Sequence, residues 1–172
     1  MSSSPAPTAR TKVLLVDDHD LIRKGLRHAF ERDRQFEVVG EAGTAAEGLR
    51  QANALQPDVV IMDLRLPDGS GLEATRALRQ ANPSMGIVVL TMYAGDDQLF
   101  GALEAGASAF VPKTAPADEV VAAARHAASS PSAFTAADLA EAMKRRLAPS
   151  GPQLSPRESQ VLRLLADGMS VA

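Results

Sequence analysis

Short apolar runs and segments with helical spacing alternate five times along this chain, and this alternation limits the fold more than any other feature. The runs are rich in Val, Ile and Leu, as strands are; they lie at residues 13–16, 36–40, 58–62, 87–90 and 109–111. The segments between them repeat apolar residues at helical spacing; these expected helices lie near residues 21–30, 44–54, 72–81, 96–104 and 116–127. Five successive strand–helix units predict an α/β fold, a parallel sheet covered by helices on both faces. This domain is predicted over residues 12–128.

Changes in composition predict three further segments. Residues 1–11 are rich in Ser, Pro, Ala and Thr without an apolar core, which indicates a disordered leader and not a signal peptide. Residues 129–152 are predicted to be a linker that contains one helix, with Thr135 as its N-cap. Residues 153–172 contain Ser-Pro-Arg-Glu at 155–158, a strong helix start because Ser caps the helix, Pro suits its first position and Glu completes a capping box.

Composition excludes several classes of function. There is no Cys, so disulfides, Cys-ligated zinc and thiol catalysis are excluded, and a cytoplasmic protein is expected. The net charge is -3, whereas a protein that mainly coats nucleic acid would be basic. No apolar run approaches the ~18 residues that a membrane span needs, and no membrane association is expected.

Polar side chains stand where the predicted strands end. In an open parallel sheet, ligands bind outside the carboxyl ends of the strands. The side chains expected to meet there are Asp17, Asp18, Asp63, Thr91 and Lys113. The end of the second strand offers Glu41, which we expect at the sheet edge and outside the site. Taken singly, each of these residues is more often structural than functional; their joint placement predicts a site.

This set of side chains predicts a particular chemistry. Three carboxylates held together repel one another unless a cation lies among them. Ligation by oxygen atoms alone suits Mg²⁺, and Mn²⁺ also accepts such ligands. One carboxylate that acts as a nucleophile, with a Lys and a hydroxyl beside it for the anion, is suited to the formation of an acyl phosphate.

Four motifs, in order, strongly resemble those of response-regulator receiver domains; they occupy residues 14–19, 60–71, 89–93 and 105–113. The resemblance covers about residues 11–128 and implies a flavodoxin-like fold with five strands in the order 2-1-3-4-5. The tail from Leu154 through Ser170 resembles the opening of a LuxR-type helix-turn-helix domain. Together the two parts resemble the NarL/FixJ subfamily of transcriptional regulators, with the helix-turn-helix part truncated.

The resemblance implies a role for each site residue. Asp63 is the phosphoacceptor and ligates Mg²⁺ (or Mn²⁺) together with Asp18 and the backbone carbonyl of Arg65. Asp17 acts in the outer shell of the metal, and Lys113 pairs with the phosphoryl group. Thr91 is a catalytic and a switch residue, which moves to hydrogen-bond the phosphoryl group. Phe110 follows it inward as the switch aromatic. Family members usually carry Tyr at the last position, and Phe lacks its hydroxyl.

The function implied is that of a two-component response regulator. A partner histidine kinase phosphorylates Asp63, and transcription is controlled through a C-terminal DNA-binding domain that is incomplete in this chain. No DNA-binding residues are therefore expected among these 172 residues, and promoter DNA is a partner of a longer parent only. A homodimer is expected on phosphorylation, through the face formed by the fourth helix, the fifth strand and the fifth helix. Apart from its own phosphorylation and dephosphorylation, the protein is not expected to be an enzyme.

Two alternatives remain open from the residues alone. One is an aspartyl-phosphate phosphohydrolase, which would need an acid two residues after the nucleophile; position 65 is Arg, which argues against it. The other is an interaction module with a vestigial acidic site. The histidines, His19, His28 and His126, lack metal-ligand spacing and are predicted to be surface or helix residues; of these, His19 abuts the acidic site. The cations at 144–146 are predicted to complement a helix dipole.

Overall fold

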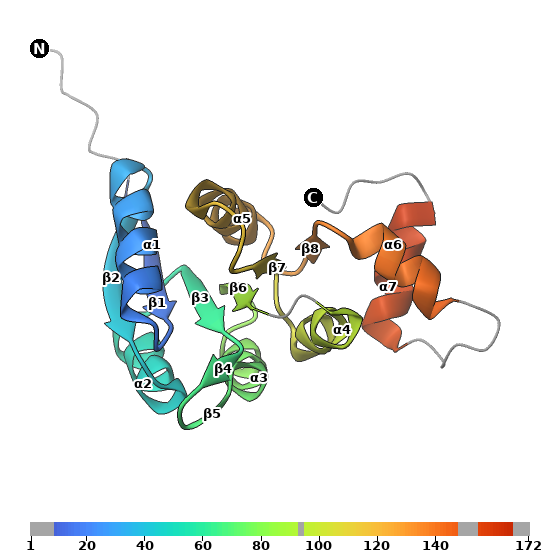
Figure 1. Cartoon of the computed structure of the whole chain (residues 1–172), viewed down its shortest axis with the longest axis horizontal. Helices are drawn as coiled ribbons and strands as arrows, with labels where there is room; N and C mark the ends of the chain where they lie inside the picture. The colour runs from blue at the N-terminus through green and yellow to red at the C-terminus, as the bar shows by residue number, and fades with distance from the viewer. Residues whose placement is uncertain (1–8, 93–94, 148–154, 167–172) are drawn as a thin grey trace, which may run out of the picture.

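The computed structural model describes residues 9–92, 95–147 and 155–166. A parallel sheet of six strands, ordered β2-β1-β3-β6-β7-β8, runs through the molecule (Figure 1). Its strands are β1 (Thr11–Val16), β2 (Phe36–Ala42), β3 (Val59–Asp63), β6 (Gly86–Thr91), β7 (Ala109–Pro112) and β8 (Thr135–Ala136). A small antiparallel pair, β4 (Arg65–Leu66) and β5 (Gly69–Ser70), follows β3. The helices are α1 (Asp20–Arg32), α2 (Ala45–Leu55), α3 (Gly71–Ala81), α4 (Asp96–Ala105), α5 (Ala117–Ser129), α6 (Leu139–Arg146) and α7 (Pro156–Ala166).

The central strands are apolar over most of their length because helices cover both faces of the sheet. On one face, alternate strand residues pack with α1 and α5; these include Val13, Leu15, Ile61, Val88 and Leu90. On the other face, the intervening residues pack with α2, α3 and α4; these include Leu14, Val16, Val60, Met62 and Val89. Without β8, the large sheet has the strand order β2-β1-β3-β6-β7, which is the order 2-1-3-4-5 that the resemblance predicts. The flavodoxin-like α/β fold is therefore confirmed.

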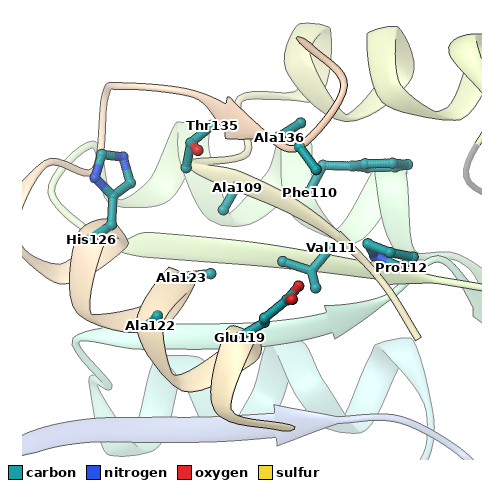
Figure 2. Close-up of a pocket in the computed structure, with 11 residues that line it drawn as sticks. Ala109, Phe110, Val111, Pro112, Glu119, Ala122, Ala123, His126, Thr135 and Ala136 are labelled. Atoms are coloured by element: carbon teal, nitrogen blue, oxygen red, sulfur yellow. The ribbon is translucent and has the colours of Figure 1, made fainter. Parts of the chain in front are cut away.

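The sheet has a sixth strand that the sequence analysis did not predict. Thr135 pairs with Ala109 and Ala136 with Phe110, in parallel register (Figure 2). The backbone N–H of Thr135 donates to the carbonyl of Ser108, 3.1 Å away. This strand covers backbone groups of β7 that would otherwise lie at an open edge. Two residues are too few to show a strand period, which is why the sequence did not reveal it.

The prediction that Thr135 caps the linker helix is therefore wrong. The helix, α6, begins at Leu139 with Asp138 in the N-cap position. A cavity of about 310 Å³ lies between β7, β8 and α5, beside the segment that precedes α6 (Figure 2).

The linker helix and the helix after it pack on α4 (Figure 1). Five buried residues of this C-terminal part share one core cluster with α4: Phe134, Leu139, Ala142, Met143 and Val161. The start of α7 has the predicted capping box, since Glu158 N–H donates to Ser155 Oγ at 3.1 Å and Ser155 N–H to Glu158 Oε2 at 2.9 Å. Of the segments predicted at the two ends of the chain, residues 1–8 and 167–172 lie outside the described residues.

The basic run at 144–146 does more than complement a helix dipole. Arg145 forms a bidentate ion pair with Asp96 of α4, at 2.6 and 2.8 Å. Arg146 lies 3.1 Å from buried Glu158 of α7, while Lys144 pairs within its own helix. Two of the three cations thus connect separate helices.

None of the described helices combines the length and apolar character that crossing a membrane would demand.

Candidate functional site

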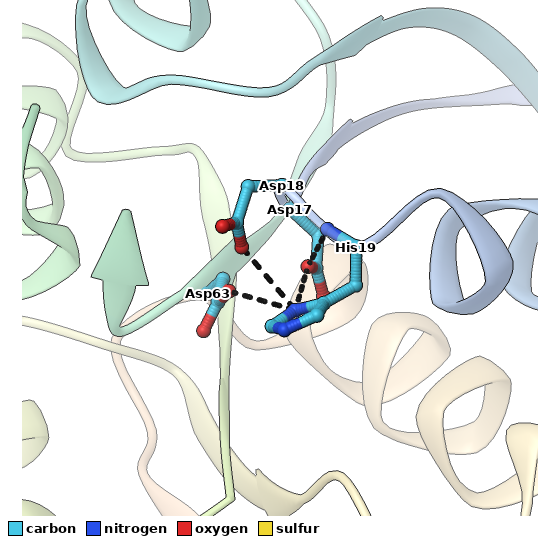
Figure 3. A group of neighbouring side chains, drawn as sticks. All are labelled: Asp17, Asp18, His19 and Asp63. Atoms are coloured by element: carbon cyan, nitrogen blue, oxygen red, sulfur yellow. Dashed lines mark hydrogen bonds and ion pairs between the residues drawn. The ribbon is translucent and has the colours of Figure 1, made fainter. Parts of the chain in front are cut away.

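The predicted site residues meet at the carboxyl edge of the sheet. β1, β3, β6 and β7 are parallel neighbours, so their ends lie side by side. Asp17 follows β1, Asp63 ends β3 and Thr91 ends β6, while Lys113 directly follows β7. Figure 3 shows the carboxylates of Asp17, Asp18 and Asp63 gathered around the ring of His19.

Lys113 is enclosed by two buried carboxylates. Its Nζ lies 2.8 Å from Asp63 Oδ2 and 2.9 Å from Asp17 Oδ2. All three side chains are almost inaccessible to solvent, with exposed fractions of 1% for Lys113, 2% for Asp17 and 3% for Asp63. The backbone N–H of Lys113 donates to the carbonyl of Thr91 at 2.7 Å, which ties it to β6. A buried ion pair with two carboxylates positions the ammonium against the predicted nucleophile.

Opposing effects act on the Asp63 carboxyl group. Burial raises its pKa above the ordinary value, and the neighbouring charge of Asp17 raises it further. The hydrogen bond from Lys113 and the one from the backbone N–H of Arg65, at 3.1 Å, lower it in part. Burial is the largest cause, so the net direction is upward. Any added positive charge beside Asp63 would favour its ionised, nucleophilic form.

Asp18 lies at the rim of this group, with a side chain 35% exposed. It belongs, with Asp17, His19 and Asp63, to a set of four residues whose candidate ligand atoms lie within 4.8 Å of one another. Carboxylates at this spacing fit a hard divalent cation with oxygen ligands. The three predicted carboxylates are therefore brought together.

His19 is itself a member of the site, whereas the sequence analysis predicted only a surface or helix residue that abuts it. Its side chain is half exposed, but Nδ1 lies 3.0 Å from Asp17 Oδ1 and 3.2 Å from Asp18 Oδ1. The same atom lies 3.1 Å from Lys113 Nζ. Its position directly after Asp17-Asp18 at a strand end was the signal that could have identified it.

Thr91 and Arg65 complete the lining of the site. Together with His19, Asp63 and Lys113 they line a cavity of about 200 Å³. Thr91 is buried at the end of β6, whereas the Arg65 side chain is exposed. These residues surround the space in front of Asp63.

Phe110 does not reach the site. It is buried within β7, between Val89 of β6 and Ala136 of β8. As predicted, Glu41 stands apart from the acidic group, where it pairs with Arg23 and Arg27 of α1. Arg23 also donates to the carbonyl of Asp17; no local sequence pattern marked this contact, which braces the strand end from outside.

Comparisons with known proteins agree with this geometry. The family described as Response regulator receiver domain matches residues 13–125. The transcriptional regulatory protein LiaR of Bacillus subtilis is 37% identical over 163 residues, 91% of this chain and 77% of LiaR. The DNA-binding transcriptional activator DevR/DosR of Mycobacterium tuberculosis is 36% identical over 166 residues, 92% of this chain and 76% of the relative.

Solved structures show the same likeness. A two-component response regulator of the LuxR family from Aurantimonas sp. superposes with a TM-score of 0.74 and 35% identity, over 81% of this chain and 100% of that one. The RcsB response regulator of Salmonella typhimurium superposes with a TM-score of 0.70 and 27% identity, over 94% of this chain and 79% of RcsB. The family match ends before α6, so it leaves the helix-turn-helix resemblance of residues 153–172 untested.

Proposed function

This chain belongs to the response regulator receiver domain family, and from that membership we propose that it is a NarL/FixJ-type two-component response regulator phosphorylated on Asp63 by a partner histidine kinase. The observation that carries the proposal is the burial of Lys113 between Asp17 and Asp63 at the carboxyl edge of the sheet. A buried acid with a fixed ammonium beside it is the equipment for attack on a phosphoryl group.

The proposed reaction transfers a phosphoryl group. A carboxylate oxygen of Asp63 forms a bond to phosphorus as the bond from phosphorus to the kinase histidine nitrogen breaks. The electron pair of that bond leaves with the histidine. Lys113, already 2.8 Å from Asp63 Oδ2, stands where it can pair with the incoming charge. The Thr91 hydroxyl, across the same cavity, supplies a hydrogen bond. We propose no other catalysis by this chain than its own phosphorylation and dephosphorylation.

The side chains present fit the divalent cation that such a site uses. The single ammonium of Lys113 leaves the three carboxylates with excess negative charge, and Asp17 and Asp63 are buried. A divalent cation would compensate that charge. We propose that Asp18, Asp63 and the backbone carbonyl of Arg65 hold Mg²⁺ or Mn²⁺, with Asp17 in the outer shell. When bound, such a cation would supply positive charge that offsets the charge of the phosphoryl oxygens. The chain's own contribution is to hold these acids at one point.

The response to phosphorylation runs, we propose, through Thr91 and Phe110. A charge-assisted hydrogen bond from Thr91 contributes about 1.5–3 kcal/mol, whereas reversing a 1:99 equilibrium needs ~5.5 kcal/mol. Other contacts must supply the difference. In the sequence α4 follows the β6 strand that ends at Thr91, and Asp96 of α4 pairs with Arg145 of α6. A shift of α4 on phosphorylation would therefore act on the C-terminal helices.

We also propose homodimerisation after phosphorylation. The predicted face comprises α4, β7 and α5, and in this structure β8, α6 and α7 of the same chain cover much of its α4 and β7 part. Dimerisation through that face therefore requires these segments to move first. A phosphorylated protein that stays monomeric at high concentration would contradict this proposal.

For the output, we propose control of transcription through DNA bound by the longer parent, since DevR/DosR is described as a DNA-binding transcriptional activator. The chain spans 76% of that relative. The expectation that these 172 residues alone bind no specific site stays a prediction, which a mobility shift at the cognate promoter would refute. We propose the cytoplasm as the site of action, with which a chain lacking Cys is compatible.

The test is intact mass after incubation with acetyl phosphate and Mg²⁺. Wild type should gain one phosphoryl group, about 80 Da, and Asp63→Asn should gain none. Asp118→Asn, an exposed carboxylate on α5, is the matched control and should react like wild type. An unmodified wild type would contradict the proposal, and turnover of a generic phosphate ester would favour a phosphohydrolase instead.

A further inference from the structure

We propose that His19 is a nitrogen ligand of the acidic site and that it makes this site bind late transition-metal ions, such as Ni²⁺, Co²⁺ or Cu²⁺, more tightly than Mg²⁺. The inference concerns the same carboxylates as the proposed function, but its test needs no phosphorylation. It assigns to His19 a part in choosing the cation.

The first argument is the spacing of the donor atoms. Ligand atoms that each lie ~2.1 Å from one ion are ~3.0 Å apart in an octahedron and ~3.4 Å apart in a tetrahedron. His19 Nδ1 lies 3.2 Å from Asp18 Oδ1, within that range, and 3.0 Å from Asp17 Oδ1, the carboxylate proposed for the outer shell. Asp63 Oδ2 lies 3.9 Å from the same nitrogen. The imidazole nitrogen therefore stands among the carboxylates as one more member of a ligand set (Figure 3).

The second argument is that the neighbours of Nδ1 make conflicting demands. The carboxylates of Asp17 and Asp18 only accept hydrogen bonds, whereas the ammonium of Lys113, 3.1 Å away, only donates. One ring nitrogen either carries a proton or presents a lone pair, so it satisfies one kind of neighbour at a time. A metal ion ligated by the nitrogen lone pair and by Asp18 would also offset the charge of Asp17 in its outer shell.

The third argument is charge. Three carboxylates and one ammonium leave two negative charges, which matches a divalent cation. Asp17 and Asp63 are buried, so solvent screens this charge poorly.

The preference between ions follows from ligand type. Mg²⁺ favours oxygen ligands and keeps several waters, so an imidazole contributes little to its binding. Imidazole suits Ni²⁺, Cu²⁺ and Zn²⁺, and affinity for such mixed sites rises along the first row to Cu²⁺. Late transition-metal ions should therefore compete with Mg²⁺ for the same carboxylates.

The experiment compares metal affinities in the 172-residue chain without a polyhistidine tag. Ni²⁺ and Mg²⁺ are titrated separately by calorimetry, and Cu²⁺ is used for pulsed EPR, which detects imidazole nitrogen near the ion. Wild type should bind Ni²⁺ at least about tenfold more tightly than Mg²⁺. His19→Gln should lose about tenfold or more in Ni²⁺ affinity together with the nitrogen signal, and change Mg²⁺ affinity by less than about threefold.

Two controls locate the ligand. His28→Ala removes an exposed imidazole of α1 and should leave every value unchanged. Asp18→Asn should weaken both Ni²⁺ and Mg²⁺, because the nitrogen and the carboxylates act on one ion.

Three outcomes would overturn the inference: unchanged Ni²⁺ affinity in His19→Gln, equal losses for Ni²⁺ and Mg²⁺ in that variant, or full Ni²⁺ affinity in Asp18→Asn. Each of these is compatible with normal phosphorylation of Asp63. Failure of the mass-shift test, in turn, leaves the metal affinities measurable, so the two proposals fail separately.

Discussion

The burial of charged side chains at the strand ends determines how a substitution of a single site residue changes the stability of the protein. Lys113 stabilises two carboxylates, but they repel each other, and burial disfavours their ionised form. Removing one partner of a buried ion pair usually leaves a costly unpaired charge. When Asp63 is neutralised, Lys113 still has its ion pair with Asp17. Neutralising Asp63 therefore leaves no buried charge unpaired.

We therefore expect Asp63→Asn to be more stable than wild type at neutral pH in EDTA. Burial raises the pKa of Asp63. When the pKa of a carboxyl group is higher in the folded state than in the unfolded state, the protonated group stabilises the fold. This contribution is complete at pH values below the unfolded-state pKa and is lost as the pH rises through the folded-state pKa. The urea midpoint of Asp63→Asn should therefore exceed that of wild type at pH 7, and the difference should shrink as the pH falls toward ~4. A gap that widens on acidification would contradict the argument.

Gly71 supports the site through its lack of a side chain. A Cβ at this position would lie 1.9 Å from the Asp63 carbonyl oxygen and 2.8 Å from Leu64 Cα, both backbone atoms that cannot turn aside. We expect Gly71→Ala to lower the free energy of unfolding by about 1–3 kcal/mol and to reduce the yield of phosphorylated protein. Urea unfolding and intact mass measure the two effects.

Gly25 supplies the control for this substitution. It lies in α1, where a Cβ would meet nothing within 4 Å. Gly25→Ala should stabilise the protein by roughly 0.5–1 kcal/mol, because Gly is unfavourable inside a helix. Equal effects of the two substitutions would show that the Asp63 backbone can move at little cost.

At the level of elements, α4 is held at both ends by the C-terminal helices. Asp96 at its start forms the bidentate pair with Arg145. At its other end, Arg157 of α7 donates to the carbonyls of Leu103 and Ala107, and burial lowers the pKa of Arg157 to about 10. Arg146 lies over the ring of Phe100, 4.6 Å from its centroid. Any shift of α4 therefore disturbs α6 and α7.

Arg157→Ala should detach α7 from α4. Losing these hydrogen bonds leaves the carbonyls of Leu103 and Ala107 without their charged donor, at a cost of about 1–3 kcal/mol. Hydrogen exchange of the α7 amides should rise, with the amides of β1 and β3 unaffected. Arg163→Ala, an exposed cation on the same helix, is the control and should change neither measurement. Protection of α7 that survives in Arg157→Ala would mean that apolar packing alone holds it.

On the scale of the whole molecule, buried contacts cross the predicted boundary at residue 128. The family match ends at residue 125, but Phe134, Leu139 and Met143 share a core cluster with Leu103 of α4. Phe134 also lies beneath Arg157, 5.6 Å from ring centroid to guanidinium carbon. The C-terminal segment thus contributes to one face of the receiver core.

A chain that ends at residue 128 should consequently be less stable than the 172-residue chain. It would expose apolar surface of α4 and remove the strand beside β7. Each large side chain left uncovered costs about 1.5–3 kcal/mol. A lower urea midpoint and stronger binding of a hydrophobic dye are expected. Identical midpoints would show that the segment rests on the core without stabilising it.

The amino-acid sequence by itself determined the sheet of five strands, its helices and the polar residues at the strand ends. These features are local or periodic: strand runs such as 59–62 are apolar on both faces, and the Ser155–Glu158 box lies within four residues. To predict that the polar residues at the strand ends meet, one needs only the rule that parallel strands present their carboxyl ends at one edge of the sheet. The sequence could therefore predict that Asp17, Asp63 and Lys113 meet in one site.

Only the tertiary structure decided how the C-terminal part is arranged and what His19 contacts. β8 exists because β7 offers backbone partners at its edge, and two residues carry no period of their own. The Arg145–Asp96 contact joins residues 49 apart, and no spacing rule predicts which exposed cation meets which acid. His19 faces the carboxylates because of the backbone path after β1. Such contacts depend on the packed arrangement of separate elements, which local sequence does not specify.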